Sequence, residues 1–252
     1  ILLVIGVYMR ISVMETPVFQ EVLSAKRTAR TPLIETFKSY PLSLLFGLLA
    51  NLQVFATFYI FNTYFVSYGA SVLQMPKNLF VNATLIGALF LGITIPLSGF
   101  LSDRIKRRAI ILFGYFLTIV FAFPYFSLIN TQVPVFIILA ATISLIIFGI
   151  FYGPIAAFNT ESFPPALRYT GSSLIYQVAG ATAGGFSPMI AVYLYKTFGS
   201  TYAISLYIAL VGVLSLIGSA FLKSVSHLEV HQMVNTPLGQ IPETSSSSIE
   251  GQ

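Results

Sequence analysis

Long apolar runs separated by short polar segments make up most of the chain. Six runs reach the roughly 20 residues that an α-helix needs to cross a bilayer. Their ends coincide with turn-forming pairs such as Tyr40-Pro41 and Phe198-Gly199, and their interiors carry no charged residue. The pattern predicts an all-α polytopic membrane protein, with spans over residues 41–68, 78–101, 109–129, 134–158, 171–195 and 202–222.

Shorter segments flank the six runs. Residues 1–9 are apolar but too short to span, so we interpret them as the end of a preceding transmembrane helix and expect a longer protein. Residues 10–39 are predicted to form a central cytoplasmic loop, with a short surface helix beginning at Pro17. Residues 40–222 then form a six-helix transmembrane bundle, and the polar residues 223–252 form a disordered cytoplasmic tail.

Composition narrows the class of protein further. Only 8% of the residues are charged and 56% are hydrophobic, whereas about a quarter of an average soluble domain is charged. Most of the surface is therefore expected to contact the lipid bilayer. The sequence contains no cysteine, which excludes disulfides, thiolate catalysis and cysteine-ligated metals within these residues.

The basic residues indicate how the bundle is oriented. Eleven of the thirteen Lys and Arg residues fall in one set of loops, and only Lys77 and Lys196 fall in the other. Because cytoplasmic loops are rich in Lys and Arg, both flanks of the bundle are predicted to be cytoplasmic. The net charge of +5 is thus explained by topology, and we do not expect nucleic acid as a partner.

Polar side chains inside the predicted spans are candidates for solute binding, because they are costly in hydrocarbon. Asn51, Phe55, Tyr59 and Asn62 recur at helical spacing and fall on one stripe. They suit a neutral polar or zwitterionic solute, although the two Asn side chains could equally bond to neighbouring helices. The fifth run carries Gly180, Gly184 and Gly185 at a spacing that allows close helix packing. The candidate substrate-binding residues are Asn51, Phe55, Tyr59, Asn62, Tyr152, Tyr176 and Gln177.

The stretch GFLSDRIKRR, residues 99–108, concentrates charge that the rest of the chain avoids. Topology explains its basic residues but does not require Asp103. We expect Asp103 to cap a helix end and to pair with Arg104 or Arg107, with further charges joining the network in one conformation. Alternatively, these charges only anchor the loop. A break at 152–154 is a candidate hinge, or an ordinary proline kink. The candidate gating residues are Gly99, Asp103, Arg104, Arg107, Arg108, Gly153, Pro154, Glu161 and Arg168.

No pattern typical of an enzyme or of a cofactor site occurs in the sequence. His227, Glu229 and His231 have the spacing of a metal-binding pair, but they fall in the predicted tail without a third strong ligand. The sequence has no catalytic triad pattern, P-loop or G-x-G-x-x-G motif. We therefore expect neither an enzyme nor a bound metal or cofactor.

The same stretch, residues 99–108, resembles the cytoplasmic loop motif of the major facilitator superfamily, Gly-x-Leu-Ala-Asp-Arg-x-Gly-Arg-Arg, with Lys106 at the second Gly position. Residues 148–188, with Glu161, Pro164, Arg168 and Gly171 at their centre, resemble the tenth and eleventh helices of its metabolite:proton symporter branch. Residues 9–19 resemble the start of that branch's central loop.

This resemblance implies the C-terminal half, helices seven to twelve, of a plasma-membrane transporter built from inverted three-helix repeats. A six-helix N-terminal half is its implied partner, and helices seven, eight, ten and eleven would line the cavity while nine and twelve face lipid. The implied activity is secondary active transport of an osmolyte or organic acid by alternating access, with protons as the coupling ion. The alternative is a half-size protein that dimerises as a pore or carrier.

Overall fold

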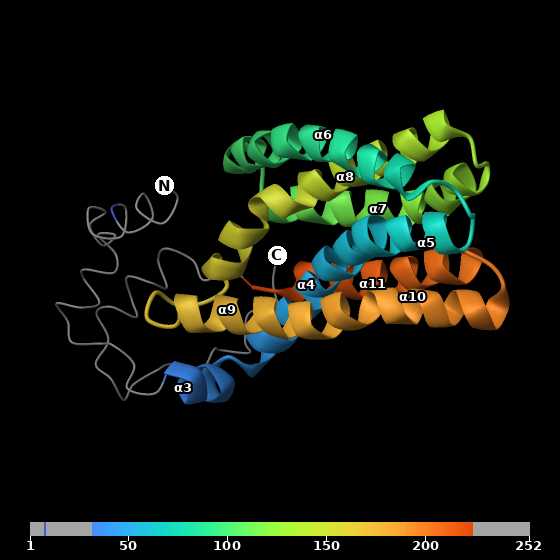
Figure 1. The fold of residues 1–252 in the computed structure, drawn as a ribbon. Coiled ribbons are helices and arrows are strands. Elements are labelled where there is room, and N and C mark those ends of the chain that lie inside the picture. The colour runs from blue at the N-terminus through green and yellow to red at the C-terminus, as the bar shows by residue number, and fades with distance from the viewer. Residues whose placement is uncertain (1–7, 9–31, 224–252) are drawn as a thin grey trace, which may run out of the picture.

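The computed structural model describes Tyr8 and residues 32–223. A short helix, α3, precedes six helical spans that run side by side along the bundle (Figure 1). The described part is therefore an all-α polytopic fold, as predicted. The elements are α3 (Pro32–Ser39), α4 (Pro41–Tyr59), η1 (Ile60–Tyr64), α5 (Phe65–Ser71), α6 (Lys77–Arg104), α7 (Arg107–Asn130), α8 (Pro134–Glu161), α9 (Arg168–Ala179), η2 (Gly180–Gly184), α10 (Gly185–Phe198) and α11 (Tyr202–Phe221).

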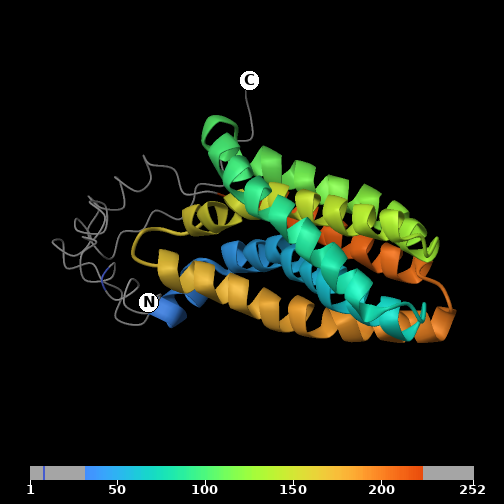
Figure 2. The same ribbon diagram turned by 45° about the horizontal axis from the view of Figure 1, so that its top comes forward.

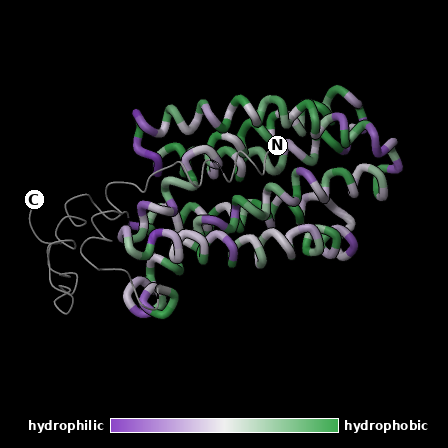
Figure 3. Tube along the Cα trace, turned by 60° about the vertical axis from the view of Figure 1, so that its left-hand side comes forward, coloured by the Kyte–Doolittle hydropathy of each residue, from purple (hydrophilic) through white to green (hydrophobic). Residues whose placement is uncertain are grey.

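Each observed span begins and ends within three residues of its predicted limits. Several helices run past the apolar runs because charged residues at the membrane surface still fit the last helical turn. Asp103 lies in the final turn of α6, and Arg107 is the first residue of α7. Figure 3 shows hydrophilic residues gathered near the helix ends and hydrophobic residues along their centres.

The predicted break at residues 152–154 is not observed, since α8 is continuous from Pro134 to Glu161 with Pro154 inside it. Irregular turns occur elsewhere, in two segments that the sequence analysis did not find. The π-helical segment η1 lies between α4 and α5, and η2 lies between α9 and α10. Turns of this kind hold one residue more than an α-turn and are frequent at functional sites.

Helix packing divides the bundle into two interlocked three-helix units. α8 packs against α6 and α7, which are the second and third spans, while α4 packs against α9 and α11, which belong to the last two. α7 and α11 join the units by packing against each other. Figure 2 shows the bundle from a second direction, with α6 crossing obliquely in front of the other spans. The first span therefore packs with the last two spans, and the fourth span packs with the second and third. This exchange of first helices between the two halves of the bundle agrees with the predicted pair of three-helix repeats.

Glycines allow a close approach between α6 and α8. A Cβ added at Gly153 would overlap the Ser98 hydroxyl and lie 2.6 Å from the Ile95 carbonyl oxygen. The Ser98 hydroxyl donates across this contact to the Gly149 carbonyl oxygen over 2.8 Å. The position that the sequence suggested as a hinge is therefore a tight helix–helix contact.

Aromatic residues fill the core at the end of the bundle opposite α3. Tyr68, Tyr125 and Phe126 belong to one buried cluster contributed mainly by η1, α5 and α7. The Tyr68 hydroxyl donates to Asn130 Oδ1 over 2.8 Å, and Asn130 in turn donates to the Thr201 hydroxyl over 3.0 Å. Tyr68, Asn130 and Thr201 thus form a hydrogen-bonded chain at this end, as polar groups in an apolar environment need partners, whereas the buried Tyr64 hydroxyl has no partner among the described residues.

Exposure differs strongly among the spans. Of the residues in the most apolar stretch of each span, 11% are buried in α6 and 22% in the fifth span. The corresponding share is 44% in both α7 and α11. On α6, the side chains of Leu85, Leu89 and Ile93 are exposed. The resemblance implies that α7 and α11 face lipid, but within the described residues the two least buried spans are α6 and the fifth span, both of which border the cavity described below.

The expected helix from Pro17, the tail beyond residue 223, the His227 pattern and nearly all of segment 1–9 lie outside the described residues.

Candidate functional site

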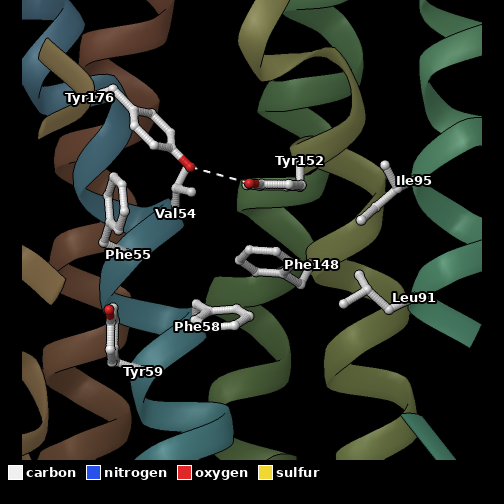
Figure 4. A pocket seen from close by; sticks show the side chains of 9 residues that line it. All are labelled: Val54, Phe55, Phe58, Tyr59, Leu91, Ile95, Phe148, Tyr152 and Tyr176. Carbon is white, nitrogen blue, oxygen red and sulfur yellow. Dashed lines mark hydrogen bonds between the residues drawn. The ribbon is translucent and has the colours of Figure 1, made fainter. Parts of the chain in front are cut away.

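A cavity of about 200 Å³ opens among α4, α6, α8 and α9, near the middle of the spans. Aromatic side chains make up most of its wall, and the remaining lining residues are aliphatic (Figure 4). Such a cavity is smaller than a typical drug-sized site of about 300–1,000 Å³. Its lining residues are Val54, Phe55, Phe58, Tyr59, Leu91, Ile95, Phe148, Tyr152 and Tyr176.

Helical spacing places the lining side chains of each helix on a single face of that helix. On α4, residues 54, 55, 58 and 59 share a face because residues three to four apart are neighbours on a helix. Phe148 and Tyr152 are one turn apart on α8, and Tyr176 reaches the cavity from α9. Four of the seven predicted substrate-binding residues, namely Phe55, Tyr59, Tyr152 and Tyr176, therefore line one cavity.

The tyrosine hydroxyls are the polar atoms of this wall. The Tyr152 and Tyr176 hydroxyls are hydrogen-bonded to each other across the cavity at 3.2 Å, as the dashed line in Figure 4 marks. The side chain of Tyr59 is 38% exposed. No charged side chain of the described residues lines the cavity.

The glycines of η2 set the distance between α4 and the fifth span. A Cβ added at Gly180 would lie 3.1 Å from Phe55 Cε1, and one at Gly184 would lie 2.9 Å from Tyr59 Cε2. The predicted close packing at these two glycines is observed, whereas a Cβ at Gly185 would meet no atom within 4 Å. The missing side chains let the backbone of η2 lie directly against the aromatic face of α4.

Three predicted residues do not line the cavity. Asn51 is fully buried and exchanges two hydrogen bonds with Asn159 of α8, at 3.0 and 2.9 Å. Its amide also donates to the Gly47 carbonyl oxygen over 2.7 Å. Asn62 donates to the Phe58 carbonyl oxygen within its own helix, over 2.9 Å, and Gln177 is exposed. The packing interpretation of Asn51 is thus the one that matches its contacts.

A cluster of charged side chains lies at the α6–α7 turn. Arg107 binds Asp103 Oδ1 over 2.9 Å through one terminal nitrogen and Glu161 Oε1 through the other. Arg107 therefore links α7 to both α6 and α8. Because Asn159 precedes Glu161 by two residues, the Asn51–Asn159 pair lies between this cluster and the cavity.

The other charged candidates bind elsewhere. The Arg104 guanidinium lies over the Phe100 ring at 4.7 Å, and Arg108 donates to the Leu222 carbonyl oxygen. Arg168 Nε donates to the Phe163 carbonyl oxygen over 3.2 Å, and Arg168 forms no ion pair among the described residues. Asp103 therefore pairs with Arg107 and not with Arg104, and Arg168 stays outside the network. A Cβ at Gly99 would meet open space.

Sequence reasoning missed several apolar residues of the cavity wall, above all Phe58 and Phe148. A signal for both was present, because each lies three or four residues from a predicted tyrosine or phenylalanine on the same helix. Polar side chains alone do not point to these two residues, because a phenylalanine ring carries no polar atom.

Comparison with known proteins identifies the family of the chain. The family model described as Major Facilitator Superfamily matches residues 1–188, which is most of the chain. The chain belongs to the major facilitator superfamily. No solved structure matches it.

Three relatives illustrate the range of this similarity. The chain is 29% identical over 232 residues to the inner membrane metabolite transport protein YhjE of Escherichia coli (strain K12), covering 90% of this chain and 52% of that protein. It is 28% identical over 236 residues to the proline/betaine transporter of the same strain, covering 89% and 46%. It is 25% identical over 178 residues to a citrate-proton symporter of Klebsiella pneumoniae, covering 70% and 40%. The chain thus spans about half the length of these relatives.

Proposed function

We propose that the chain forms one half of a secondary active transporter that moves a small polar metabolite across the membrane by alternating access. The observation that carries this proposal is the mid-span cavity, whose walls come from four different spans. A solute held between helices can be exposed to either side when those helices move. The relatives described above, a metabolite transport protein, a proline/betaine transporter and a citrate-proton symporter, support the same class.

We further propose that a second six-helix half completes the protein and that transport is coupled to protons. The bare faces of α6 and the fifth span support the first point, as does the length of the relatives. Proton coupling is supported by the family and by the name of the citrate-proton symporter. The interiors of the six predicted spans carry no charged residue, so the proposal places the proton-binding group elsewhere in the protein.

Uptake into proteoliposomes by the complete gene product tests this function. The panel contains osmolytes and organic acids, each measured with and without an imposed proton gradient. Saturable uptake of a panel member that the gradient drives above equilibrium is expected. Flux that rises linearly with solute concentration would instead favour the alternative of a half-size protein that dimerises as a pore.

The orientation proposal places the α6–α7 turn and both flanks of the bundle in the cytoplasm of the plasma membrane. Its support is the distribution of Lys and Arg among the loops. Single cysteines introduced into this naturally cysteine-free sequence offer a direct test with a membrane-impermeant thiol reagent. A cysteine at Lys106 is expected to react only in inverted vesicles, and one at Lys196 only in intact cells.

We propose that the Asp103–Arg107–Glu161 cluster holds one conformation closed by joining α6, α7 and α8 at this end. Asp103→Asn in the complete protein is then expected to lower the uptake rate while membrane insertion stays normal. Lys106→Gln is the matched control, because it removes a charge from the same turn without breaking either ion pair. Equal uptake by the wild type and by Asp103→Asn would leave the cluster with an anchoring role only.

A further inference from the structure

A second cavity lies at the end of the bundle opposite α3 (Figure 1). It has a volume of about 270 Å³ and opens between the last two turns of α7 and the first turn of α11. Because it lies at the ends of two spans, it is at the level where lipid headgroups border the hydrocarbon core. Hydroxyl groups and aromatic rings make up its wall, which consists of Phe123, Phe126, Ser127, Ser200, Thr201, Tyr202 and Ser205.

Two of the hydroxyls in this wall have protons available for a ligand. Ser200 Oγ accepts the Tyr202 backbone N–H over 3.1 Å, and Thr201 Oγ1 accepts the Asn130 amide over 3.0 Å. Neither hydroxyl donates to another of the described residues. By contrast, the Ser127 hydroxyl donates to a carbonyl oxygen of its own helix. The cavity therefore presents two hydrogen-bond donors that lack an acceptor.

The Thr201 hydroxyl ends a chain of hydrogen bonds that all run in the same direction. Tyr68 donates to Asn130, and Asn130 donates to Thr201. Each bond in such a chain polarises the next, so the last proton is a stronger donor than that of an isolated hydroxyl. The Thr201 side chain is only 9% exposed, and a buried donor without a partner carries a free-energy cost. An acceptor bound in the cavity would remove this cost.

Exposed apolar side chains lead away from the cavity along both helices. On α7, Phe116 and Val120 are exposed, and each lies two helical turns before a residue of the cavity wall. On α11, Leu206 and Leu210 are exposed and continue the four-residue spacing that begins at Tyr202. Because α7 and α11 pack against each other, these two apolar stripes run side by side from the cavity towards the middle of the bundle.

We propose that this cavity binds the phosphate group of a membrane phospholipid, whose acyl chains lie along the two apolar stripes. An ionised phosphodiester accepts hydrogen bonds and donates none, so it matches the two unpaired donors. α11 begins at Tyr202, and the N-terminus of a helix favours an anion. A soluble phosphate ester would match the donors but would leave the stripes without a partner. The site shares no residue with the mid-span cavity.

Native mass spectrometry of the purified complete gene product in detergent measures how tightly each lipid binds, and it requires no transport. Dioleoylphosphatidylglycerol is compared with glucosyl dioleoylglycerol, which has the same acyl chains and a hydroxyl-rich headgroup without phosphate. The phospholipid is expected to bind about tenfold or more tightly. Equal affinity of the two lipids would overturn the proposal. Displacement of the phospholipid by millimolar glycerol 3-phosphate would also overturn it, because the site would then be one for a soluble anion.

Substitutions at Ser200 test whether the phospholipid binds at this cavity. Ser200→Asp keeps an acceptor for the Tyr202 N–H, because an Asp side chain bonds to the backbone two residues on, but it replaces the donor with a negative charge. It is expected to weaken binding of the phospholipid by about tenfold or more, while the affinity for the glucosyl lipid and the melting temperature stay near those of the wild type.

Two control variants accompany Ser200→Asp. Ser200→Thr keeps the hydroxyl and should keep the affinity for the phospholipid. Ser127→Ala alters the same wall but removes a proton that is already bonded within α7, so it should also bind as the wild type does. Wild-type affinity of Ser200→Asp for the phospholipid would refute this cavity as the binding site.

Discussion

The tight contact between α6 and α8 allows a quantitative prediction at Gly153. In Gly153→Ala, the new Cβ would overlap the Ser98 hydroxyl and lie 2.6 Å from the Ile95 carbonyl oxygen and 2.9 Å from the Gly99 nitrogen. Ser98 can rotate away, but the two backbone atoms cannot, so the helices must separate. Overpacking of this kind costs about 1–3 kcal/mol, and the lost Ser98–Gly149 hydrogen bond adds roughly 0.6 kcal/mol.

Alanine also gains up to about 1 kcal/mol of helix propensity over glycine, so the net destabilisation expected for Gly153→Ala is about 1–3 kcal/mol. Thermal unfolding in detergent, followed by size-exclusion chromatography of the remaining folded protein, measures this change. Gly92→Ala on α6 is the control, because a Cβ there meets nothing within 4 Å, and it should be neutral or slightly stabilising. Adding Ser98→Ala to Gly153→Ala should recover only part of the loss. A melting temperature of Gly153→Ala equal to that of Gly92→Ala would refute the reasoning.

Two further predictions concern buried polar groups. Asn51→Leu leaves the Asn159 amide without its interhelical partner and should lower stability by about 1–2 kcal/mol, while Asn51→Leu combined with Asn159→Leu should recover most of the loss in the same thermal assay. Tyr115→Phe removes a buried hydroxyl that donates to an α4 carbonyl over 2.6 Å and should cost about 1 kcal/mol. Tyr193→Phe, at a side chain 67% exposed, should leave the melting temperature unchanged, and an equal shift in both variants would contradict the second prediction.

The spans could be predicted from the sequence because a bilayer requires long apolar runs, and the chain supplies them without interruption. The Asp103–Arg107 pair was also within reach, since only the short turn at Ile105 and Lys106 separates the two opposite charges in the sequence. Asn51 shows where such reasoning stops. Periodicity places it on the same stripe as Phe55 and Tyr59, but only the packing of α8 decides that Asn159 covers it.

The irregular turns were not predictable for a similar reason. The sequence of η1 contains no proline or glycine that would mark a disturbed helix, and Pro154, which does carry that signal, lies in an unbroken helix. A π turn is stabilised by what surrounds it, and here η2 packs against α4. Local sequence therefore indicates where a helix can become irregular, whereas tertiary packing decides where the irregular turn forms.

The π turn in the first span sets the angle about the helix axis between the side chains of α4 and those of α5. Each α-helical residue advances about 100° around the axis, so the extra residue in Ile60–Tyr64 offsets α5 from α4 by about that angle. With this offset, Phe55 of α4 lies at the cavity while Tyr68 of α5 lies in the aromatic core. A π turn that migrates along the span would re-aim the residues it passes without sliding the helix along its axis. The first span thereby changes the direction of its side chains at η1 while the helix continues from α4 into α5.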